Sequence, residues 1–153
     1  VYWTLNMKTL LVMLQAVWLG THITIGYVVA PMLFHFASQG ELSRAIAGNI
    51  AGELFHVVMY LGLVTAALWW LFCRNVRQPS KILNVLIVLL AVSEWVITPV
   101  IAAIKQKQSQ WLYDLVGGSF GMWHGISSSV YLHITVLLLW WTGKRLQINS
   151  QRR

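Results

Sequence analysis

Four long apolar stretches decide what this chain can fold into. They cover about residues 10–30, 51–72, 83–104 and 122–141. A helix rises 1.5 Å per residue, so about 20 apolar residues cross the roughly 30 Å hydrocarbon core of a bilayer. No alternation of polar and apolar residues appears, which argues against β-strands. The stretches predict an all-α fold, a four-transmembrane-helix bundle that forms one integral membrane domain over residues 1–153.

Composition excludes several classes of protein. Hydrophobic residues make up 58% of the 153 residues and charged residues 10%, against roughly 45–50% and about 25% in soluble domains. A soluble chain of this size cannot bury so much apolar surface, which argues against a soluble enzyme. A disordered regulator would be far more polar. The single cysteine, Cys73, rules out an internal disulfide framework or a multi-cysteine metal site.

The basic residues predict the orientation of the chain. Eight lie at the ends of the stretches that share a side with the termini, and three lie at the opposite ends. The positive-inside rule therefore places both termini in the cytoplasm. An even number of spans also requires the two termini to share a side, so the two arguments agree. The net charge of +7 is then a topology signal and no nucleic acid is expected as a partner. The expected partner is the lipid bilayer, and the expected location is the bacterial inner membrane. The larger group comprises Lys8, Arg74, Arg77, Lys81, Lys144, Arg145, Arg152 and Arg153, and the smaller one Arg44, Lys105 and Lys107.

The two halves of the chain resemble each other at an offset of 68 residues. A Val-Val-Ala-Pro run that ends at Pro31 corresponds to a Val-Ile-Thr-Pro run that ends at Pro99. His56 and His124 are separated by the same 68 residues. The pattern favours a tandem two-helix repeat, and the alternative is coincidence in a sequence of few residue types.

Six ionisable side chains fall inside the apolar stretches, where charge is costly: His22, Glu53, His56, Glu94, His124 and His133. Counted from the cytoplasmic ends, His56 and His124 are expected at one depth, about 24–26 Å, near the outer boundary. Two imidazoles on facing helices could ligate haem b, or together with Glu53 a transition metal such as copper or zinc. The alternative is that these histidines only form hydrogen bonds between helices.

Helical spacing adds neighbours to these residues. Glu53 and Tyr60 share a face with His56, and Ser128 shares one with His124, so the five predict a polar pocket near the outer leaflet. Two other residues are expected near the middle of the membrane. His22 and Glu94 lie at similar depth there, at about 16–18 Å, and are expected to pair. Such a pair serves either as a proton or ion pathway or as a buried hydrogen bond that locks two helices.

The sequence also resembles a known family. The residues that carry the resemblance are Trp18-Leu19-Gly20, Tyr27 to Phe34, Leu54-Phe55, Trp95 with Pro99, and Phe120 with the His124-Gly125-Ile126-Ser127-Ser128 run. In these the chain resembles the transmembrane-protein-205-like family, a domain of unknown function found in small membrane proteins of bacteria and eukaryotes. That family often has an asparagine one turn after the serines, where this chain has Tyr131. The resemblance implies a four-helix membrane fold without an agreed activity.

More distantly, the size and architecture are similar to those of copper-resistance protein D and the HemJ-type protoporphyrinogen oxidases, a likeness that implies haem or metal chemistry. Three hypotheses follow. The chain is a haem- or metal-binding, redox-associated protein, an accessory or homo-oligomeric subunit of a larger membrane complex, or a small ion or solute exporter. No phosphate-binding loop or nucleophile elbow is present, so whether it is an enzyme stays undecided.

Overall fold

The computed structural model describes the backbone of residues 2–73 and 81–150 and the side chains of residues 7–72 and 81–144. Over these ranges the chain is helical and contains no strand. The label η marks a short π-helical segment. The elements are α1 (Tyr2–Thr24), η1 (Ile25–Val29), α2 (Ala30–Ser38), α3 (Arg44–Cys73), α4 (Lys81–Val92), η2 (Ser93–Ile97), α5 (Thr98–Gln106), α6 (Trp111–Val116) and α7 (Phe120–Ser150).

Four continuous helical rods are long and apolar enough to cross a membrane, which confirms the predicted fold. They cover Met7–Ser38, Arg44–Phe72, Lys81–Gln106 and Phe120–Lys144. The first rod joins α1, η1 and α2 end to end, and the third joins α4, η2 and α5. Several rods extend well beyond the apolar stretches. This extra length changes the depth at which individual residues lie.

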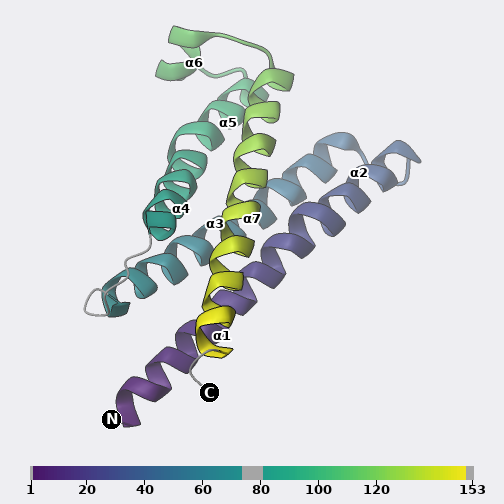
Figure 1. Ribbon diagram of the computed structural model, residues 1–153. Coiled ribbons are helices and arrows are strands. Elements are labelled where there is room, and N and C mark those ends of the chain that lie inside the picture. The colour runs from purple at the N-terminus through teal and green to yellow at the C-terminus, as the bar shows by residue number, and fades with distance from the viewer. Residues whose placement is uncertain (1, 74–80, 151–153) are drawn as a thin grey trace.

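The rods form two antiparallel hairpins that cross each other (Figure 1). The first hairpin consists of α1, η1 and α2 packed against α3, and the second consists of α4, η2 and α5 packed against α7. Between hairpins, α3 contacts α4 and α1 contacts α7. Both ends of the chain lie at the same end of the molecule, and toward α2 and α5 the hairpins diverge (Figure 1). Which side of the membrane the termini occupy stays a prediction, and Arg74 and Arg77 lie outside the described residues.

The hydrophobic core lies in the half of the molecule where the hairpins cross. It contains apolar side chains of all four rods, among them three tryptophans, Trp18, Trp69 and Trp141. The rings of Trp69 and Trp141 meet edge to face with their centroids 5.5 Å apart. Trp18 packs against Gly62, where an added Cβ atom would lie only 2.7 Å from the indole ring. A glycine at this position therefore allows α1 and α3 to approach closely.

The backbone of the first rod recurs in the third rod. The bounds of η1 and η2 differ by 68 residues, and so do those of α2 and α5. In each rod a proline, Pro31 or Pro99, lies just after the π-helical segment. A proline cannot donate to the preceding turn, so an irregular hydrogen-bond ladder is expected there. The predicted repeat therefore holds for these rods, but α7 begins at Phe120 rather than at the position equivalent to the start of α3.

Candidate functional site

The π-helical segment η2 places a carboxylate in the middle of the bundle. Glu94 is 5% exposed, and its Oε1 lies 2.5 Å from Nδ1 of His56 in α3. Glu94 is 13 residues from Lys81 and 12 from Gln106, so it lies about 18–20 Å from either end of its rod. The pair joins the two hairpins near the middle of the membrane. The His56 side chain is 38% exposed, so the pair is buried on one side only.

The predicted pairing of His22 with Glu94 is wrong, because Glu94 pairs with His56 instead. The error came from the depth assigned to His56. Its helix begins at Arg44 rather than near residue 51, so His56 lies 12 residues inside α3. That distance, about 18 Å along the axis, brings it to the level of Glu94 and away from the outer boundary.

His22 belongs to a separate group of polar side chains, the His22 cluster, formed by His22, Tyr27, Tyr131 and Thr135. The Nε2 atom of His22 and the hydroxyl of Tyr27 each lie 3.0 Å from the hydroxyl oxygen of Thr135. The Tyr131 ring stacks on the imidazole with centroids 3.9 Å apart. Its hydroxyl donates a 2.6 Å hydrogen bond to the His22 carbonyl. His22 is fully buried, and this cluster ties the first rod to α7.

Gly26 makes room for this arrangement. A Cβ atom at position 26 would lie 2.3 Å from the Tyr131 ring, so only glycine lets the ring lie against η1. The hydroxyl of Tyr131 thereby reaches a carbonyl of the irregular ladder. Phe55, which precedes His56, meets the Tyr131 ring edge-on at 5.1 Å. The His22 cluster and the His56–Glu94 pair are therefore neighbours in the bundle.

The structure does not bring the predicted outer pocket together. Phe55 contacts Tyr131, and His124 lies seven residues before Tyr131 on α7. His124 is thus displaced by about 10 Å along α7 from the level of His56. Its exposed ring stacks on Phe120, with centroids 5.7 Å apart. The remaining predicted members of the site, Glu53, Tyr60 and Ser128, are exposed.

The residues predicted to hold a haem or a metal ion are not assembled in the described part of the chain. Among the side chains of residues 7–72 and 81–144, no three His, Cys, Asp or Glu lie where they could hold a metal ion together. The expected set of Glu53, His56 and His124 is therefore not assembled. Two axial imidazoles must face each other across a haem. Here His124 lies at a different level from His56, so the two imidazoles do not face each other.

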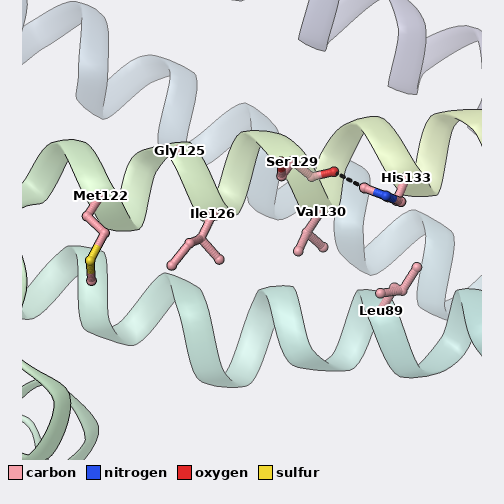
Figure 2. Close-up of a pocket in the computed structure, with 7 residues that line it drawn as sticks. All are labelled: Leu89, Met122, Gly125, Ile126, Ser129, Val130 and His133. Carbon is pink, nitrogen blue, oxygen red and sulfur yellow. Dashed lines mark hydrogen bonds between the residues drawn. The ribbon is translucent and has the colours of Figure 1, made fainter.

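An open groove of about 580 Å³ lies between α4 and α7 (Figure 2). Met122, Ile126 and Val130 point from α7 toward the neighbouring helix, and Leu89 comes from α4 (Figure 2). The exposed His133 borders the groove and donates from Nδ1 to the Ser129 carbonyl of its own helix at 2.7 Å. The groove is mainly apolar and lies away from the His56–Glu94 pair. Its lining is Leu89, Met122, Gly125, Ile126, Ser129, Val130 and His133.

Sequence reasoning missed Tyr27 as a member of the His22 cluster and did not foresee that Tyr131 packs against Gly26. A signal was available for the second contact. Gly26 lies on the same face of its helix as His22, and a glycine beside a buried polar residue often marks the close approach of another side chain. No comparable signal identifies α7 as the helix that approaches, because several faces carry aromatic residues.

Comparison with known families gives one finding. A family described as a domain of unknown function, DUF4149, matches residues 13–110. The chain belongs to this family. The match contains His22, His56 and Glu94 and ends before α7. No curated protein and no solved structure matches the chain.

Proposed function

We propose that this DUF4149 protein is a multi-pass membrane protein that provides a pathway for protons or proton-linked ions, with His56 and Glu94 as the exchange site. One observation carries the proposal. A carboxylate in the middle of a membrane-spanning rod lies 2.5 Å from an imidazole that is itself 38% exposed. Ionisable residues at this depth mark ion and proton pathways more often than they serve packing alone.

The chemistry of the pair suits proton exchange. When the pair shares one ionisable proton, that proton can reside on His56 or on Glu94 without any change in the net charge of the pair. Adding or removing one proton changes that charge, and the exposed edge of His56 is the route to the exterior. Glu94 is covered by the bundle and stores the proton, while His56 passes it on.

The finer assignments belong to the same proposal. We place the protein in the bacterial inner membrane with both termini in the cytoplasm, because most basic residues lie at that end of the rods. The resemblance to the transmembrane-protein-205-like family agrees with a four-helix membrane protein. It suggests no activity that could replace the one proposed.

Proton uptake by liposomes tests this function. The full chain is reconstituted with a pH-sensitive dye inside, and a potassium gradient with valinomycin sets the membrane potential. Uptake should exceed that of empty liposomes. Glu94→Gln should lower the protein-dependent rate by about 100-fold, the low end for loss of a proton-transfer group. His35→Gln is the matched control because that histidine is exposed on α2, and it should leave the rate unchanged.

Two results would refute the proposal. One is a rate equal to that of empty liposomes, and the other is equal uptake by the wild type and by Glu94→Gln. The same purified protein also tests the haem and metal hypothesis. A Soret band or stoichiometric copper or zinc that disappears in His56→Ala would replace the proton pathway with a cofactor site.

The second candidate function is that of an interaction subunit, either in a homo-oligomer or in a larger membrane complex. The exposed side of α7 favours it. His124 and His133 are exposed there although polar groups at membrane depth usually face protein. Gly125 and Ser129 border the groove and would let another helix approach closely (Figure 2). Native mass spectrometry in mild detergent should then show a defined oligomer that His133→Leu weakens, and a lone monomer would exclude it.

A further inference from the structure

The exposed edge of His56 leaves one polar atom without a partner. Its Nδ1 atom contacts Glu94, but its Nε2 atom forms no hydrogen bond with any side chain or backbone group of the described residues. The imidazole lies near the middle of the membrane, where the surrounding acyl chains offer neither donors nor acceptors. An unsatisfied polar atom at this depth is costly, so a partner from outside the chain is favoured.

The surroundings of His56 limit what that partner can be. On α3, Tyr60 lies one turn from His56 and is 51% exposed, and the adjacent Val57 is 63% exposed. Val57 and the Tyr60 ring present apolar surface beside the imidazole, while the exposed carboxylate of Glu53 lies one turn away in the opposite direction along α3. A molecule that reaches Nε2 across this surface must itself dissolve in the bilayer. It must also carry an oxygen that can form a hydrogen bond.

The protonation state of the pair selects the kind of oxygen. When Nδ1–H donates to the Glu94 carboxylate, the neutral imidazole has an acceptor at Nε2. An acceptor requires an O–H group on the ligand. When the imidazole is protonated, Nε2 becomes a donor, and it then binds the deprotonated oxygen of the same ligand. Any ligand with an O–H group satisfies the site in both states, whereas an ester or ether satisfies only the second. Among O–H ligands, a weak acid can also release the proton that the proposed pathway carries.

We infer that His56 and Glu94 form the binding site of a lipid-soluble weak acid, a carboxylic acid or a hydroquinone, which reaches Nε2 from within the bilayer. This inference rests on the proposed function and names its substrate class. The ligand O–H bond breaks as its proton passes to Nε2, and the Nδ1 proton passes to the Glu94 carboxylate. The products are the ligand anion, a neutral His56 and a neutral Glu94. No electron is transferred.

Photolabelling in phosphatidylcholine nanodiscs tests the inference on the full chain. Three probes carry a diazirine close to the polar group: palmitic acid, its methyl ester and an alkyl hydroquinone. Labelled residues are identified by mass spectrometry. At least one of the two acids should label α3 and η2 around His56 about tenfold more than the ester does, the effect of one charge-assisted hydrogen bond. Whichever acid labels more strongly identifies the source of the ligand.

Variants and competition make the test specific. His56→Leu should abolish the acid-dependent labelling, and His35→Leu, which changes an exposed histidine of α2, should leave it unchanged. Because His56→Leu removes a contact between hairpins, competition on the wild-type protein provides a test that needs no variant. Unlabelled palmitic acid or hydroquinone should reduce the labelling, and methyl palmitate should not.

The outcomes separate this inference from the proposed function. Equal labelling by acid and ester, or full labelling in His56→Leu, overturns the inference, and proton uptake that depends on Glu94 would still support the pathway. Acid-dependent labelling without any proton uptake would keep the binding site and refute the pathway. If methyl palmitate competes as well as palmitic acid, the groups around His56 recognise only an apolar chain, and the inference fails.

Discussion

The two π-helical segments occupy equivalent places in the two hairpins but hold different chemistry. The second residue of η1 is Gly26, and the Tyr131 ring from α7 fills the space beside it. In η2 the equivalent position is Glu94, which meets His56 from α3. The first contact is neutral and its His22 carbonyl acceptor is buried, while the second is ionisable and partly exposed. The same backbone irregularity thus carries either a packed aromatic ring or an ionisable contact, depending on the residue at one position.

The largest expected effect tests how tightly the first segment is filled. Gly26→Ala should lower the free energy of unfolding by about 1–3 kcal/mol, because the new methyl group overlaps the Tyr131 ring. The control is Gly52→Ala, where a Cβ atom meets nothing within 4 Å and the change should be neutral or stabilising. Thermal unfolding in detergent measures both. Equal stability of the two variants would mean that the Tyr131 ring does not lie against η1.

Tyr131→Phe tests the hydrogen bond of the first segment separately from its packing. The stacked ring is retained, but the His22 carbonyl loses its 2.6 Å donor. We expect a loss of about 1–2 kcal/mol in the free energy of unfolding. Tyr60→Phe, at an exposed position, should change it by less than about 0.5 kcal/mol. If both variants lose the same stability, the two hydroxyls are equivalent and the comparison between segments loses its basis.

A double-mutant cycle on His56 and Glu94 measures the contact in the second segment. With His56→Gln, Glu94→Gln and the double variant, we expect a coupling of about 1 kcal/mol in the free energy of unfolding. Exposure of His56 limits the value to the range of partly solvated pairs. A coupling near zero would show that the pair does not hold the hairpins together. Proton uptake by the same variants then distinguishes a structural contact from a functional one.

The smallest effect concerns the backbone of the second segment. The Thr98 hydroxyl donates to the Ser93 carbonyl at 2.9 Å, and the backbone N–H of Thr98 bonds to the same oxygen. Thr98→Val should therefore cost only about 0.5 kcal/mol, since one donor remains. Thr98→Ser keeps the hydroxyl and should behave like the wild type. A loss in Thr98→Val as large as that in Tyr131→Phe would contradict this ranking of the two segments.

The sequence predicts the fold of this chain better than its site, for a physical reason. Apolar length alone determines how many helices can cross a bilayer, and the four rods agree with that count. The partner of a polar residue depends on depth to within one helical turn. The extension of α3 back to Arg44 moved His56 from the outer boundary to the level of Glu94. Both residues were identified as candidates, but their pairing was not.

The crossing of the hairpins has a mechanical consequence. The packed core, which includes Trp18, Trp69 and Trp141, lies on the side of the molecule that carries the termini, while α2 and α5 diverge on the other side (Figure 1). The hairpins are therefore packed together mainly at this core, and from His56 and Glu94 to the ends of their rods the two arms extend 12 residues each, about 18 Å. A rotation of one hairpin against the other would displace the ends of the rods most and the groups beside the core least. His56 and Glu94 belong to different arms, so their contact opposes rotation of one hairpin against the other.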